Sequence, residues 1–203
     1  MTEKETLFAM PFLFLNLPGE VRNQILRLLL IHRTTIVVHH FALLHPPSPT
    51  ALDLYPSILL ANRAVYNEGR TILYGENVFQ AHPMILLDTL FALCVHRPVS
   101  QNCVAHIRRF HIRVRLDSDP YYTPWQVRDA FTNVDELEVE VFRASFEAGN
   151  YLALDGFAGV RGVKKARVHG SIKTECAHWL EQRMMGNDGQ ALGTLAEQGF
   201  ELS

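Results

Sequence analysis

The sequence predicts an α/β protein with an α+β N-terminal part, in which helices come first and a short parallel sheet of βα repeats follows. Three stretches of the second half, 107–116, 137–141 and 165–169, alternate strictly between apolar and polar residues, as half-buried strands do. A helical pattern follows each stretch, and strand–helix–strand repeats form right-handed crossovers and parallel sheets. Because a parallel sheet covered on both faces has continuously apolar strands, this alternation predicts helices on one face only, a leucine-rich-repeat-like layout.

The helices of the second half have recognisable ends. Thr123 is an N-cap residue followed by a proline at the first helical position, so a helix is expected from Pro124 to Phe131. Residues 142–162 are expected to be partly helical. A last helix is expected over residues 171–185, ending at Gly186.

The N-terminal half is organised around Leu15–Leu30, which predicts an amphipathic helix. Pro18 is expected as the first helical residue, with Glu20 in the first turn, where an acidic side chain is favourable. The stripe expected to face a second helix consists of Val21, Ile25, Leu28 and Leu29. Leu17, Leu26 and Leu30 lie off that stripe. The helix is therefore either a core element alone or, because it is apolar on two sides, also a docking helix.

A second long helix is expected after the proline-rich loop at 45–56. Ser57 is a good N-cap for this helix, Gly69 would allow a close approach, and Gly75 would end it. The sequence thus predicts a helical hairpin whose two helices pack against each other.

Two short strands are expected beside these helices, and they are predicted to pair with each other. They are Thr34–Phe41, which is rich in β-branched residues, and Asn77–Ala81. A further helix is expected over Pro83–Cys94. The chain is accordingly divided into a helical part with an inserted strand pair, 1–98, and a βα-repeat part, 99–203, packed together as one unit.

Two stretches resemble the fungal F-box-like domain proteins. The first carries the Leu-Pro, acidic and aliphatic positions of the F-box at Leu17, Pro18, Glu20, Val21, Ile25 and Leu26. The second lies within Pro56–Phe79 and matches at Leu59, Leu60, Asn62, Arg63, Tyr66, Glu68, Leu73, Tyr74, Gly75, Asn77 and Phe79. Together they cover about the first 80 residues.

The resemblance implies a substrate receptor of a cullin–RING ubiquitin ligase. Such a protein performs no chemistry itself: its helices grip a Skp-type adaptor, and its C-terminal part holds a protein substrate. The residues it implies for adaptor binding are Leu17, Pro18, Val21, Ile25, Leu26 and Leu29. Two other functions stay open: an enzyme or small-molecule-binding protein with a pocket lined by histidines and arginines, and a secreted or nuclear regulator that keeps the fold without the ligase.

The outward residues of the three predicted strands are basic, acidic and basic in chain order. If sequential strands are neighbours, opposite charges lie side by side, and Arg113 should lie near an acidic side chain of Glu136–Glu140. This charge ladder either solvates an exposed sheet or forms a recognition face. The candidate recognition residues are Arg109, His111, Arg113, Arg115, Glu138 and Arg167.

The composition and net charge indicate which kinds of partner are not expected for this chain. The chain has 203 residues, with 48% hydrophobic and 20% charged residues, which is typical of a folded globular protein. A net charge of −2 gives no general attraction to nucleic acid, and no apolar run is long enough to span a bilayer. The three cysteines, Cys94, Cys103 and Cys176, are odd in number and form no CxxC, so reduced thiols in the cytoplasm or nucleus are expected.

Motifs for catalysis are missing from the sequence. There is no GxSxG, P-loop or GxGxxG, and no pair among the ten histidines stands at a metal-ligand spacing with a cysteine or acidic partner. No catalytic residue, cofactor or metal is therefore expected. A pocket of the alternative kind would lie near His111 and Asp117, because ligands bind at the carboxyl ends of parallel strands.

Overall fold

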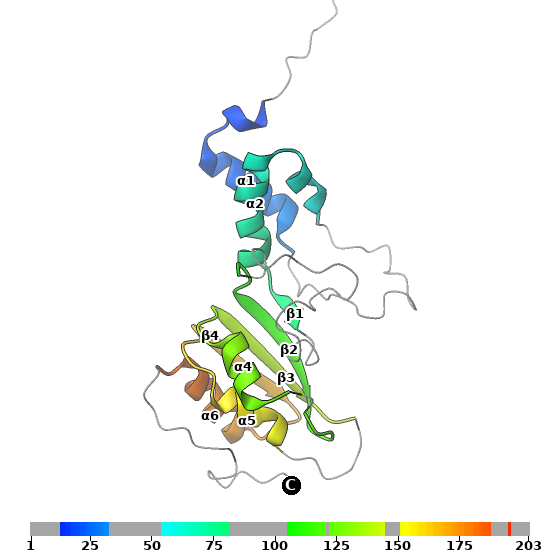
Figure 1. The fold of residues 1–203 in the computed structure, drawn as a ribbon, viewed down its shortest axis with the longest axis vertical. Helices are drawn as coiled ribbons and strands as arrows, with labels where there is room; N and C mark the ends of the chain where they lie inside the picture. Colours follow the sequence, from blue (N-terminus) through cyan, green and yellow to red (C-terminus); the bar gives the residue numbers. More distant parts are fainter. Residues whose placement is uncertain are drawn as a thin grey trace, which may run out of the picture.

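The computed structural model describes residues 13–32, 54–81, 105–120, 122–144, 151–187 and 195. The protein is a mixed α/β structure, as predicted, with a pair of helices at one end and a four-stranded sheet with its own helices at the other (Figure 1). The predicted strand Thr34–Phe41, the predicted helix Pro83–Cys94 and the expected boundary near residue 98 lie outside the described residues.

The helical part consists of α1, Gly19–Leu30, and α2, Arg63–Glu76, each preceded by a short 3-10 helix, Phe14–Asn16 (η1) and Pro56–Leu60 (η2). Its buried residues form one hydrophobic cluster of Leu26, Leu30, Val65, Ile72 and Leu73. The helices approach closely at Gly69, as predicted: a Cβ there would lie 3.0 Å from Leu30 Cδ1 of α1 and would overlap the Leu59 side chain of η2.

The predicted inner stripe of α1 is wrong. Leu26 and Leu30 are completely buried against α2, whereas Leu28, expected to face inward, is 80% exposed and Val21 is 39% exposed. With 100° of rotation per residue, Val21 and Leu28 lie on the side of α1 opposite the buried pair. The helix is apolar on two sides, but Leu26 and Leu30, expected off the stripe, face α2, and of the expected stripe Leu29 still packs against the buried cluster.

The limits of both helices also differ from the prediction. Pro18 is the N-cap of α1 and not its first residue. In α2 the N-cap is Asn62, whose Oδ1 accepts a hydrogen bond from the Val65 N–H at 3.0 Å, while Ser57 belongs to η2. The helix also continues through Gly75 to Glu76.

Asn77, immediately after α2, ties the two helices together at their C-terminal ends. Its Nδ2 donates to the carbonyl oxygens of Leu30 (2.7 Å) and Leu73 (2.8 Å), and its Oδ1 accepts from the His32 N–H (2.7 Å). Both carbonyls belong to last helical turns, where no intrahelical donor is available. The buried Asn77 therefore caps the end of α2, where Gly75 was expected to end the helix.

The sheet contains β1 (Phe79–Ala81), β2 (Arg109–Arg115), β3 (Glu136–Phe142) and β4 (Lys165–Gly170), all parallel and in chain order. The predicted parallel sheet with sequential neighbours is confirmed. The strand at residues 77–81 was expected to pair with Thr34–Phe41; in the described residues β1 pairs with β2.

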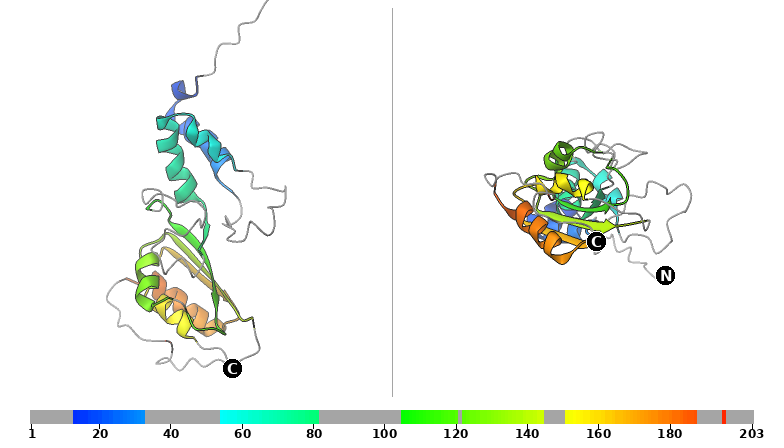
Figure 2. Two further views of the ribbon diagram at one scale, coloured as in Figure 1. Left: turned by 45° about the vertical axis from the view of Figure 1, so that its right-hand side comes forward. Right: turned by 90° about the horizontal axis from the view of Figure 1, so that it is seen from below.

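Three helices accompany the sheet: α4, Pro124–Phe131; α5, Leu152–Ala158; and α6, Thr174–Met185. The left view of Figure 2 shows them together on one side of the sheet. There the apolar residues of the strands and helices form a second hydrophobic cluster, which includes the ring contacts Phe110–Phe131 (5.3 Å between centroids) and Phe131–Phe157 (6.1 Å). Tyr74 of α2 stacks on Phe79 of β1 and so connects the helical pair to the sheet.

Candidate functional site

Two surfaces of the structure carry residues that the sequence analysis named as candidates for binding. The first is the side of the sheet away from the buried cluster, here called the charged face. Its residues are Arg109, His111, Arg113, Arg115, Glu136, Glu138, Glu140, Lys165, Arg167 and His169, and all of them are at least partly accessible. The second is the outward side of α1, here called the outer stripe, formed by Pro18, Val21, Ile25 and Leu28.

The parallel register sets the charged face in rows across the strands. Arg109, Glu136 and Lys165 form one row, and His111, Glu138 and Arg167 form the next. The third row is Arg113, Glu140 and His169. Since successive side chains of a strand point to opposite faces, every second residue contributes, and a basic or histidine side chain stands on each side of every glutamate.

Ion pairs join neighbouring strands within these rows, as the charge ladder predicted. Arg113 Nε lies 3.1 Å from Glu140 Oε2, which confirms the expected acidic neighbour of Arg113. The same guanidinium lies over the Phe142 ring, 4.8 Å from its centroid. Lys165 pairs with Glu136. Most of these groups are open to solvent, so each pair is worth little, up to about 1 kcal/mol.

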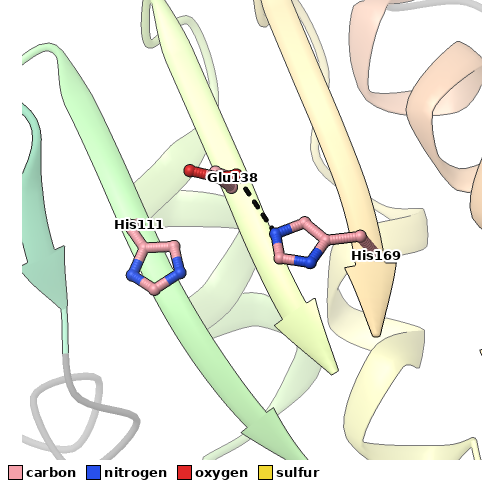
Figure 3. Close-up of side chains that lie close together, drawn as sticks. All are labelled: His111, Glu138 and His169. Atoms are coloured by element: carbon pink, nitrogen blue, oxygen red, sulfur yellow. Dashed lines mark hydrogen bonds and ion pairs between the residues drawn. The ribbon is translucent and has the colours of Figure 1, made fainter. Parts of the chain in front are cut away.

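The centre of the charged face brings together His111, Glu138 and His169, one from each of β2, β3 and β4 (Figure 3). His169 Nε2 lies 3.1 Å from Glu138 Oε1, and all three possible ligand atoms lie within 4.8 Å of one another. Sequence analysis expected no such cluster. The residues are far apart in the chain, so a search for local spacing misses them; the alternation together with a parallel register is the signal that could have found them.

Arg109 and Arg115, at the ends of β2, contact backbone and loop groups. Arg109 Nη1 donates to the Glu76 carbonyl oxygen at 3.3 Å, which joins the sheet to the end of α2. Arg115 makes two hydrogen bonds to Asp117, whose Oδ2 also accepts from the Ala144 N–H at 3.1 Å. The Asp117 side chain is fully buried in these contacts, so the expectation that it lines a ligand pocket gains no support.

The six residues expected to bind an adaptor are not on one surface. Pro18 and Val21 are exposed, whereas Leu26 is completely buried. The remaining three, Leu17, Ile25 and Leu29, are partly buried. Leu28 was not among the six and is the most exposed leucine of α1. Leu26 therefore serves the core.

Hydrogen bonds and ion pairs hold α1, the helix that carries the outer stripe, against α2. Arg22 of α1 donates to both carboxylate oxygens of Glu68 on α2, at 2.6 and 3.0 Å, and to the Leu17 carbonyl oxygen at 2.6 Å. These hydrogen bonds hold the pKa of Glu68 below its usual value and raise that of Arg22. Arg27 forms a second pair with Glu76 at 2.8 Å. The outer stripe therefore stands on a helix whose rotation is fixed by side-chain contacts.

The buried titratable groups of the sheet part include Cys176 and Tyr122, whose pKa values are raised because burial disfavours their charged forms. The Cys176 thiol, in α6, has its pKa raised to about 11. The Tyr122 hydroxyl, which donates to the Ala153 carbonyl oxygen at 2.9 Å, also has a raised pKa. Neither group has the character of an activated nucleophile or base.

Comparisons with protein-family models, curated proteins and solved structures find no match to this chain. Among the described residues, no helix combines the length and apolar character needed to cross a membrane.

Proposed function

We propose that the chain is a non-catalytic protein-interaction module that resembles an F-box substrate receptor of a cullin–RING ubiquitin ligase. The observation that carries the proposal is the outer stripe. α1 already buries Leu26 and Leu30 against α2, yet Val21 and Leu28 stand exposed on its other side. Single exposed leucines are ordinary, but apolar residues at helical spacing along one helix are what a helical partner binds.

The partner of the outer stripe would be a Skp-type adaptor. Pro18, Val21 and Ile25 belong to the F-box-like stretch and also to the outer stripe, so the resemblance and the exposure favour the same side of α1. Leu28 extends this surface by a further turn. Each aliphatic side chain that binding removes fully from water would contribute about 1.5–3 kcal/mol.

The charged face would hold the protein substrate. An open sheet with helices behind it is a leucine-rich-repeat-like layout, and rigid strands keep its side chains in fixed rows. A partner segment with charges of both signs would suit the alternation of arginine, glutamate and histidine there. The proposal places the protein in the cytoplasm or nucleus, where such ligases act.

The test is adaptor binding by the double variant Val21→Asp/Leu28→Asp. Both side chains are exposed, so the variant should melt within a few degrees of the parent while its affinity for a purified Skp-type adaptor falls at least tenfold. Leu152→Asp, an exposed leucine of α5, is the matched control and should bind as the parent does. Isothermal titration calorimetry measures the affinity, and circular dichroism the melting.

Three results would contradict the proposal. The first is a parent protein that does not bind the adaptor at all. The second is a Val21→Asp/Leu28→Asp variant that binds as tightly as the parent. A large drop in melting temperature for this variant would place the outer stripe in a closed core and would also count against docking.

A further inference from the structure

The neighbouring strands β2, β3 and β4 place two imidazoles and one carboxylate side by side on the charged face (Figure 3). His111 and Glu138 are register partners, and His169 lies one row further along, opposite Glu140. All three side chains point to the same side of the sheet and keep some exposure, 14%, 29% and 38% respectively. An ion arriving from solvent can therefore reach them.

We propose that His111, Glu138 and His169 form a binding site for a divalent first-row transition metal ion of the zinc type. Two imidazole nitrogens with one carboxylate oxygen are a donor set that zinc and non-haem iron sites use, with coordination positions left open. Calcium and magnesium prefer oxygen ligands throughout and do not suit this set. This inference goes beyond the proposed adaptor function and does not depend on it.

The distances between the three ligand atoms fit a metal site that forms by movement of the side chains alone. Metal–ligand bonds of about 2.0–2.2 Å put tetrahedral ligand atoms roughly 3.3 Å apart. His169 Nε2 and Glu138 Oε1, at 3.1 Å, already stand at that separation. The largest separation among the three ligand atoms is at most 4.8 Å, so closure requires a shift of about 1.5 Å. Rotation of the partly exposed His111 ring can supply this shift while the strand backbones stay in place.

Glu140 supports the arrangement from beside the cluster. Its Oε2 lies 3.4 Å from His111 Nε2, and Arg113 Nε holds the same oxygen at 3.1 Å. A metal-bound histidine typically donates its second ring N–H to a carboxylate, which fixes the ring orientation. Glu140 offers that acceptor, and Arg113 keeps it in position.

Arg167 is the competitor for the site. Its Nη1 lies 3.6 Å from Glu138 Oε1, the oxygen that faces His169. The Arg167 side chain is 68% exposed, so this ion pair is weak and its guanidinium can leave toward solvent when a metal ion takes the carboxylate. Arg167→Ala should accordingly bind the metal at least as tightly as the parent.

The test is titration of the full chain, freed of metal with a chelator, with Zn²⁺ in a calorimeter. We expect one ion per chain at the cluster, and each of His111→Gln, Glu138→Gln and His169→Gln should weaken its binding at least tenfold. His178→Gln is the matched control, because His178 is an exposed histidine of α6 paired with Glu181 and away from the charged face. The control should change the affinity less than twofold, and circular dichroism without metal checks that each variant is folded.

Cobalt provides a second readout that does not depend on the variants. Co²⁺ bound by nitrogen and oxygen ligands absorbs in the visible range without a thiolate charge-transfer band, so a cysteine site elsewhere in the chain would be recognised. The proposal is overturned if the parent binds no stoichiometric Zn²⁺, if stoichiometric binding survives His111→Gln/His169→Gln, or if the Co²⁺ spectrum shows thiolate ligation.

Discussion

Asn77→Ala should destabilise the helical part more than the substitution of any single polar residue within α1 or α2. The side chain is 1% exposed and makes three hydrogen bonds, to the carbonyl oxygens of Leu30 and Leu73 and from the His32 N–H. Alanine removes all three bonds and leaves two carbonyl oxygens and one N–H without this partner in a buried place.

The size of the effect follows from those contacts. At roughly 1 kcal/mol for each of three hydrogen bonds, the loss is about 3 kcal/mol, and desolvated backbone groups can raise it further. For a chain of this length, 3 kcal/mol corresponds to a fall of about 6–12 °C in melting temperature. Asn62→Ala is the comparison, because it removes one N-cap bond and should cost about 1 kcal/mol.

Urea unfolding measures the free energy of unfolding of Asn77→Ala and of Asn62→Ala, and hydrogen exchange shows which part of the protein is destabilised. We expect amides of α1 and α2 to lose protection in Asn77→Ala while those of β2 and β3 keep it, since the sheet has its own hydrophobic cluster. An Asn77→Ala variant within about 0.5 kcal/mol of the parent, or no more destabilised than Asn62→Ala, would refute this account of the helix ends.

Two further predictions concern titratable groups. The Arg22 hydrogen bonds lower the pKa of Glu68 in the folded protein, so the stability they supply is present above the pKa of the unfolded state and is lost as pH falls through the pKa of the folded state. The difference in melting temperature between the parent and Glu68→Gln should therefore be largest near neutral pH and shrink below about pH 4. A difference that stays constant with pH would contradict this assignment. Cys176, buried and with its pKa raised to about 11, should stay unlabelled by a thiol reagent at pH 7 until urea unfolds the protein, and peptide mass spectrometry that found it labelled in the native state would show the burial to be wrong.

The sheet could be predicted from the sequence because its signal is local and repeated. Each of β2, β3 and β4 carries its own two-residue alternation, and the charges of neighbouring strands are complementary. The capped start of α4 is equally local: Gln126 Oε1 accepts hydrogen bonds from the Thr123 N–H and hydroxyl, at 2.8 and 3.0 Å. Such features need no knowledge of distant contacts.

The inward side of α1 could not be predicted in the same way. Between Ile25 and Leu30 only Arg27 is polar, so apolar residues stand on nearly every side and the helical period does not choose among them. The choice is made by long-range contacts, namely the packing of Leu26 and Leu30 beside Gly69 of α2, together with the pairs of Arg22 with Glu68 and Arg27 with Glu76. A pattern within one helix holds no information about these partners on another helix.

The cluster at the centre of the charged face could be predicted from the sequence only in part. His111, Glu138 and His169 could each be assigned to the outward side of a strand from the sequence. Their meeting depends on register, which decides whether the histidines of β2 and β4 flank the same glutamate of β3. His111 and Glu138 were candidate recognition residues and His169 was not, and the sequence analysis did not predict that the three meet.

The chain-order sheet also has a consequence for folding during synthesis. Each strand after β1 pairs with one that was made earlier, roughly 30 residues before it, so β2, β3 and β4 each find a neighbour that is already synthesised. The helical pair emerges first and leads directly into β1, and each βα unit can then add to an existing edge. Such stepwise growth keeps unsatisfied edges short-lived on a ribosome that adds about 5–20 residues per second.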